Sequence, residues 1–235
     1  IMGVMFGPAA FLWIVLGTIF GGAVHDFISA MMSLRSDGAS LPELVGRELG
    51  PVVRQVIRVV STVLLVLVAA VFVVTPAGLL AGMTPSWATP VFWIAVIFLY
   101  YMLATLLPVD KLIGRFYPVF GFALLFMAGG LMCVLLFGGH VIPDGFSEGL
   151  FNRHAAADTH PVFPMMFVSI ACGAISGFHA TQSPMMARCL KSEKLARPVF
   201  YGAMVAEGIV ALVWAAAAIT FTGGYESLGE YMASH

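Results

Sequence analysis

The sequence predicts an all-α polytopic membrane protein, and three observations support this fold class. Hydrophobic residues make up 60% of the 235 residues and charged residues only 10%, whereas soluble domains contain about 45–50% and about 25%. The apolar residues gather into runs long enough to cross a bilayer. Positive charges lie on alternate connections between these runs. The formal net charge of −1 excludes nucleic acid as a main partner.

Six apolar runs are candidate spans, because a bilayer core about 30 Å thick needs roughly 20 apolar residues per helix. They cover residues 8–34, 54–82, 89–107, 116–139, 163–190 and 198–222. We expect one transmembrane region over residues 1–235, with the fifth run broken near 177–184. Because the chain starts at Ile1 and stops soon after the last run, we interpret it as an internal fragment of a longer membrane protein.

The positive charges predict the orientation, since short loops rich in Lys and Arg stay in the cytoplasm. Ten of the eleven positive residues follow the first, third or fifth run, and only Arg153 lies on the other side. The ten are Arg35, Arg47, Arg54, Arg58, Lys111, Arg115, Arg188, Lys191, Lys194 and Arg197. The first of these connections also predicts a short amphipathic helix, which begins at the capping box Ser40–Glu43 and ends at Gly50.

Motifs for nucleotide binding or hydrolysis are not found in the sequence. It has no Walker or Rossmann glycine loop, no GxSxG elbow and no HExxH motif. The His residues of segment 140–162 lack metal-ligand spacing. We therefore expect no catalytic residue, no metal and no cofactor.

Three ionisable residues inside the runs are candidates for proton coupling: His25, Asp26 and Glu207. Each costs about 2.5–3.5 kcal/mol near the bilayer centre, so each needs a partner or a purpose. His25 and Asp26 are about 100° apart around a helix, so we expect each to face another helix or water rather than its neighbour. They either stabilise helix packing or form a proton relay. Glu207 is either structural or proton-carrying, and its neighbour Gly208 would let another backbone approach.

The fifth run contains the candidate substrate site. Its helical pattern is expected to stop after Gly177, since a polar stretch leads into Pro184. Irregular backbone survives at membrane depth only where it lines protein or a water-filled cavity, as in secondary transporters. The alternative is a simple end of the span at Gly177. The predicted binding residues are Ser176, Gly177, Phe178, His179, Thr181 and Gln182.

Three separated strings resemble the carbon starvation protein CstA family: FLWIVLGTIFGGAVHDF at 11–27, GASLPELV at 38–45 and ACGAISGFHA at 171–180. The resemblance implies a multi-pass symporter of the bacterial inner membrane that takes up peptides or pyruvate during nutrient limitation. The expected coupling ion is H⁺. It also implies a LeuT-type fold, with two inverted five-helix repeats whose first and sixth helices are broken. The fifth run here would be that sixth helix.

The function expected from these observations is proton-coupled import of peptides or pyruvate. Two alternatives without transport remain, a membrane nutrient sensor and an intramembrane enzyme. An enzyme needs a nucleophile and a base within reach, and only His179 with Ser176 or Ser183 could supply them.

Overall fold

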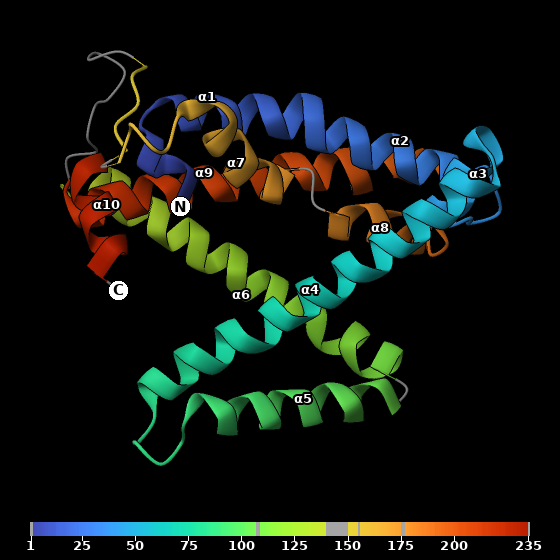
Figure 1. The fold of residues 1–235 in the computed structure, drawn as a ribbon, viewed down its shortest axis with the longest axis horizontal. Helices are drawn as coiled ribbons and strands as arrows, with labels where there is room; N and C mark the ends of the chain where they lie inside the picture. Colours follow the sequence, from blue (N-terminus) through green and yellow to red (C-terminus); the bar gives the residue numbers. More distant parts are fainter. Residues whose placement is uncertain (1, 107–108, 140–149, 155, 175–176, 235) are drawn as a thin grey trace.

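The computed structural model describes residues 2–106, 109–139, 150–154, 156–174 and 177–234, and its regular structure over these residues is entirely helical (Figure 1). The α-helices are α1 (Ala9–Leu16), α2 (Ala23–Leu34), α3 (Leu41–Leu49), α4 (Pro51–Met83), α5 (Pro90–Leu106), α6 (Val109–Phe137), α7 (Phe167–Ala174), α8 (Gly177–Ala187), α9 (Ala203–Thr222) and α10 (Tyr225–Ser234). Two short 3-10 helices are η1 (Met2–Phe6) and η4 (Glu193–Leu195). Three π-helical segments are η2 (Gly17–Gly22), η3 (Val162–Met166) and η5 (Arg197–Gly202).

Four of the described helices are long and apolar enough to span a membrane. They cover Ala9–Leu34, Pro51–Met83, Pro118–Phe137 and Glu193–Thr222, while Pro90–Leu106 and Val162–Ala171 are shorter apolar helices. The described helices are therefore those of a helical multi-pass membrane protein. Each of the six predicted runs contains an apolar helix, and their number as complete crossings stays a prediction.

The expected break at 177–184 is wrong. Residues 177–187 form α8, with Pro184 inside the helix, whereas the preceding helix α7 ends at Ala174. Ser183, Pro184 and Ala187 are buried, and α8 packs against α2. This tertiary packing outweighs the local preference of proline against helix. Ser176, one of the predicted binding residues, lies outside the described residues.

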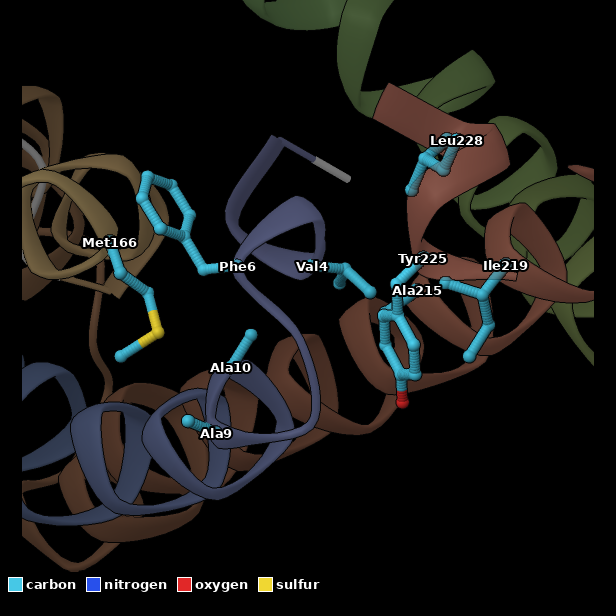
Figure 2. Close-up of a cluster of buried hydrophobic side chains, with 9 residues drawn as sticks. All are labelled: Val4, Phe6, Ala9, Ala10, Met166, Ala215, Ile219, Tyr225 and Leu228. Carbon is cyan, nitrogen blue, oxygen red and sulfur yellow. The ribbon is translucent and has the colours of Figure 1, made fainter. Parts of the chain in front are cut away.

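The main hydrophobic core joins the two ends of the chain. Val4 and Phe6 of η1 pack with Met166, with Ile219 of α9 and with Leu228 of α10, as Figure 2 shows. A second small cluster consists of Ala30, Ala187, Ala196 and Phe200, and it fastens α2 to α8 and η5. These two clusters fix the helices that carry the ionisable residues.

The predicted amphipathic helix is confirmed as α3. Ser40 and Glu43 form the expected capping box, with the Ser40 amide donating to Glu43 Oε2 at 2.9 Å. Beyond α3, helices α4 and α5 pack against each other as a hairpin; α4 also contacts α3 and α8, whereas α5 lies away from the layer of α1, α2 and α9 (Figure 1). Only Ala77 of α4 is buried, and no residue of α5 is. Nearly every residue of the hairpin is therefore at least partly exposed at the surface of the described structure.

Candidate functional site

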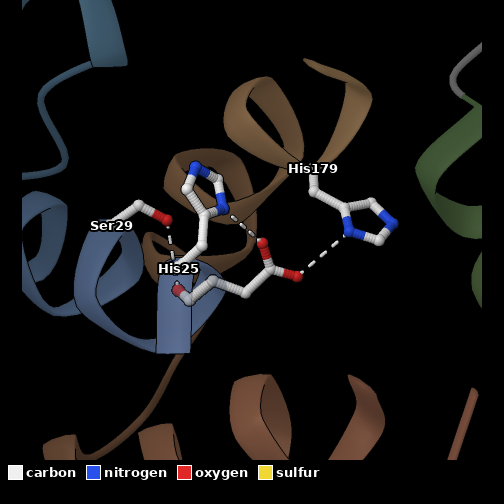
Figure 3. A network of polar contacts seen from close by, with 4 residues as sticks. His25, Ser29 and His179 are labelled. Carbon is white, nitrogen blue, oxygen red and sulfur yellow. Dashed lines mark hydrogen bonds and ion pairs between the residues drawn. The ribbon is translucent and has the colours of Figure 1, made fainter. Parts of the chain in front are cut away.

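Asp26 is the centre of a polar cluster between two helices, drawn in Figure 3. Its Oδ1 lies 2.9 Å from Nδ1 of His25 on α2, and its Oδ2 lies 3.2 Å from Nδ1 of His179 on α8. The contact with His25 has hydrogen-bond geometry. His179 Nδ1 is buried without such a bond, so its contact with Asp26 is electrostatic and becomes an ion pair when His179 is protonated. Asp26 itself is only 6% exposed.

The expectation that His25 and Asp26 cannot pair is wrong. The angle of 100° separates the two Cα–Cβ directions, but the side-chain torsions still bring Nδ1 to Oδ1. The second part of the expectation is correct for Asp26, because this carboxylate also contacts another helix through His179. Asp26 thus connects α2 with α8 at a buried position.

A cavity of about 320 Å³ opens beside this cluster. Its walls come from α2, α8, η5 and α9. The lining residues are Asp26, His179, Gln182, Ser183, Met186, Val199, Phe200, Ala203, Met204 and Glu207. They include two carboxylates and one imidazole, and no Lys or Arg is among the described lining residues. The volume falls in the range of small-molecule pockets, about 300–1,000 Å³.

The cavity brings together four of the residues selected from the sequence: Asp26, His179, Gln182 and Glu207. Glu207 is exposed and forms no hydrogen bond or ion pair with the part of the chain that the structure describes. His25 and Thr181 do not line the cavity. His25 contacts Asp26, which does line it. Gly177 and Phe178 belong to the first turn of α8, and the Phe178 side chain lies outside the described part of the structure.

Ser183 is a lining residue that the sequence reasoning assigned no binding role. It is 4% exposed and follows His179 by four residues, so both lie on one face of α8. Residues four apart lie on the same face only inside a helix. Because the sequence predicted non-helical backbone here, it did not predict that Ser183 and His179 share a face. Val199 and Phe200 of η5 also line the cavity. Nothing in the sequence distinguishes these two apolar residues from the other apolar residues of the spans.

Each of the two long helices that supply the carboxylates contains a π-helical segment next to the site. Segment η2 ends at Gly22, four residues before Asp26, and η5 ends at Gly202, five residues before Glu207. Such segments are often found at functional sites, since the extra residue redirects the side chains that follow. At Gly208 the close neighbour is a side chain rather than the backbone that was expected, because a Cβ there would lie 2.8 Å from Thr18 Cγ2.

The loops at one end of the cavity helices are tied together. Arg35, which caps α2, donates through Nε to Glu193 Oε1 at 2.8 Å. Arg188, just after α8, donates through Nε to the Gly38 carbonyl at 2.7 Å. Gly38 has φ of +74°, and a Cβ there would lie 2.6 Å from Arg188 Cγ, so this contact requires glycine. The loops after the first and fifth predicted spans therefore lie on the same side, as their positive charges predict.

Two overlapping segments of this chain match the same protein family. The carbon starvation protein CstA family matches residues 1–92 and 86–233. A membrane protein of Haemophilus influenzae is 41% identical over 278 aligned positions, covering 98% of this chain and 75% of that relative. The aligned length exceeds the 235 residues of the chain, so the relative has residues without a counterpart here.

More distant relatives carry functional names. The peptide transporter CstA of Bacillus subtilis is 29% identical over 88% of this chain and 44% of its own length. The pyruvate/proton symporter BtsT of Escherichia coli is 27% identical over 86% of this chain and 36% of its own length. The chain thus spans less than half of these named relatives. No solved structure matches it. With the family matched over almost the whole chain, the protein belongs to the carbon starvation protein CstA family.

Proposed function

We propose that this chain forms the core of a secondary transporter that imports peptides or pyruvate together with protons during carbon starvation. The observation that carries the proposal is the Asp26 carboxylate, buried between imidazoles of two helices on the wall of a cavity. The names of the relatives, peptide transporter and pyruvate/proton symporter, support these two substrate classes. A transporter of this kind needs no catalytic residue and no cofactor.

Proton coupling is assigned to Asp26, His25 and Glu207. The Asp26 carboxylate contacts the imidazoles of His25 and His179. These three side chains together can hold a variable number of protons, which they share. Because one imidazole comes from α2 and the other from α8, a change in protonation changes the attraction between these helices. Glu207 faces the same cavity from α9 and offers a second carboxylate.

The substrate is assigned to the region of Ser176, Gly177, Phe178, His179, Thr181 and Gln182. Two of these residues, His179 and Gln182, lie on the cavity wall and support the assignment. Ser183 is added to the proposed site because it is buried and shares the wall with them. The polar atoms would hold the substrate beside the groups that carry the proton.

We further propose a LeuT-type arrangement of inverted repeats, in which α7 and α8 correspond to the two halves of a broken helix. The resemblance of the string at 171–180 to the carbon starvation protein CstA family supports this assignment, since this string covers the end of α7 and the start of α8. In alternating access one helix group moves against another around the central site. The ties Arg35–Glu193 and Arg188–Gly38 would then hold one end of the cavity closed and separate during release.

Uptake into proteoliposomes containing the full-length protein tests the proposal. With an imposed pH gradient, we expect accumulation of labelled pyruvate or of a labelled dipeptide. Asp26→Asn and Glu207→Gln should abolish gradient-driven accumulation and leave exchange intact, because they remove the proton acceptors but preserve size. Glu48→Gln, on the exposed side of α3, is the matched control and should accumulate substrate normally.

Two outcomes would contradict the proposal. Failure to take up either substrate, with or without a gradient, would remove the transport function and favour a sensor or an enzyme. Unchanged accumulation in both carboxylate variants would leave transport in place but exclude Asp26 and Glu207 from coupling.

A further inference from the structure

A small basic cavity lies at the junction of α3 and α4, apart from the proposed transport site. It has a volume of about 230 Å³ and is lined by Glu43, Gly46, Arg47 and Arg54. Gly46 shapes it, because a Cβ at this position would lie 2.7 Å from Cβ and Cδ of Arg54. The Arg54 side chain therefore crosses the α3 backbone at the one residue that has no side chain.

The two arginines of this cavity are poorly neutralised. Arg54 Nη2 lies 4.0 Å from Glu43 Oε1, while Glu43 Oε2 already accepts the hydrogen bond of the Ser40 amide. Within the described part of the chain, Arg47 has no hydrogen bond and no ion pair. Glu48 is the other acidic residue of α3, and it does not line the cavity. Two guanidinium groups thus face one partly engaged carboxylate.

The surroundings of the cavity are apolar and exposed. Leu49 is 66% exposed, Val52 is 75% exposed and Val56 is 54% exposed. Arg54 lies in the first turn of α4, the longest apolar helix of the described chain, so the cavity is at the level where a span meets the membrane surface. The positive charges predict that this surface faces the cytoplasm.

We propose that Arg47 and Arg54 bind the phosphate of an anionic phospholipid of the cytoplasmic leaflet. Guanidinium groups bind phosphate oxygens through paired N–H donors. Basic pockets beside transmembrane helices recognise lipid headgroups in this way. The exposed Leu49 and Val52 would contact the acyl chains of the same lipid. A soluble phosphate would use the arginines but not these apolar contacts. This site does not depend on the proposed transport function.

Lipid titration by native mass spectrometry of the purified full chain tests the proposal. We expect phosphatidylglycerol to bind more tightly than phosphatidylcholine with the same acyl chains. Because each lining arginine would lose its charge-assisted hydrogen bonds to the lipid phosphate, Arg47→Ala with Arg54→Ala should weaken phosphatidylglycerol binding about tenfold or more. Arg58→Ala is the matched control, because Arg58 lies one turn further along α4 and does not line the cavity. It should bind phosphatidylglycerol as the original chain does.

A second variant keeps the test decisive if the double variant does not fold. Gly46→Ala favours helix formation, yet its methyl group must displace Arg54. We expect normal helix content by circular dichroism together with weaker phosphatidylglycerol binding. The proposal is overturned if Arg58→Ala weakens binding as much as the double variant, or if phosphatidylcholine binds equally well. It is also overturned if inorganic phosphate at the same concentration displaces the lipid, since the site would then be one for soluble phosphate.

Discussion

The helices around the cavity and the α4–α5 hairpin are both apolar, but they differ in what their residues contact. The cavity helices bury Thr18, Asp26, Ser29, Ser33 and Ser183. In the hairpin, Ala77 is the only buried residue of α4 and α5 has none. Hydrophobicity therefore does not distinguish a packed helix from an exposed one in this protein, because lipid is as apolar as a protein core.

Glycine shows the same difference between the two regions. Gly208 of α9 lies against Thr18, so the absence of a side chain lets two helices approach. Gly78 and Gly82 of α4 are four residues apart, a spacing that allows close helix contacts, but a Cβ on either would meet nothing within 4 Å. Small residues together with buried polar groups identify the packed region. Small residues four positions apart do not identify it alone, and neither does a long apolar helix.

The largest expected effect comes from removing the central carboxylate. Asp26→Ala leaves His179 Nδ1 buried without its charged partner, so we expect a loss of about 3 kcal/mol of unfolding free energy. In the hairpin, Tyr101→Phe removes only an exposed 3.4 Å hydrogen bond to the Phe72 carbonyl and should change stability by less than about 0.5 kcal/mol. Unfolding of both variants in the same detergent measures the difference. Equal effects would contradict the contrast between the two regions.

A pair of glycine substitutions should act with opposite signs. Gly208→Ala places a methyl group 2.8 Å from Thr18 Cγ2 and should destabilise the protein by about 1–3 kcal/mol. Gly78→Ala meets open space and improves helix propensity, so it should stabilise by up to about 1 kcal/mol. Thermal unfolding of the two variants provides the measurement. A stabilising Gly208→Ala would show that these helices can separate at no cost.

A smaller effect is expected at the tie between loops. Arg35 and Glu193 are 72% and 50% exposed, so their ion pair should contribute about 0.2–1 kcal/mol. Arg35→Ala should lose this amount at low salt and nothing at about 1 M salt, where the Debye length falls to about 3 Å. The exchanged pair Arg35→Glu with Glu193→Arg should restore stability. Lack of recovery in the exchanged pair would show that Arg35 acts through another contact.

The smallest effect concerns the connection that joins the two regions. The hydrogen bond from the Ser40 amide holds the pKa of Glu43 below its ordinary value of 4.5. Because this pKa is lowered by folding, the stabilisation of the α3 N-terminus is complete above pH 4.5 and is lost as the pH falls through the lowered value. The protection factor of the Ser40 amide, which compares its hydrogen exchange with the intrinsic rate at the same pH, should therefore fall in acid. Glu43→Gln should remove this pH dependence, and an unchanged dependence would assign it to another group.

Local and compositional features were predictable from the sequence. The apolar runs predicted helices, and Ser40 with Glu43 predicted the start of α3, since a capping box needs only residues three apart. The cost of ionisable groups in lipid selected Asp26 and Glu207, which the structure brings to one cavity. The three strings predicted the CstA family, which the comparisons confirm.

Other features depended on contacts between distant parts of the chain. The proline of the fifth run predicted irregular backbone over 177–184, but this segment is helical and packs against α2, with Ala187 in the cluster that contains Ala30. The pairing of His25 with Asp26 depended on side-chain torsions, which helical periodicity does not specify.

The sequence by itself determined which segments form apolar helices, where α3 begins and which ionisable residues need a partner, because these follow from transfer free energies and from spacing of a few residues. Only the tertiary structure decided that Asp26 meets His179, that Gly208 rather than Gly78 makes a close contact, and that Arg54 crosses Gly46. The reason is physical: in lipid every apolar face is satisfied, so the faces that pack are selected by mutual fit between helices distant in sequence.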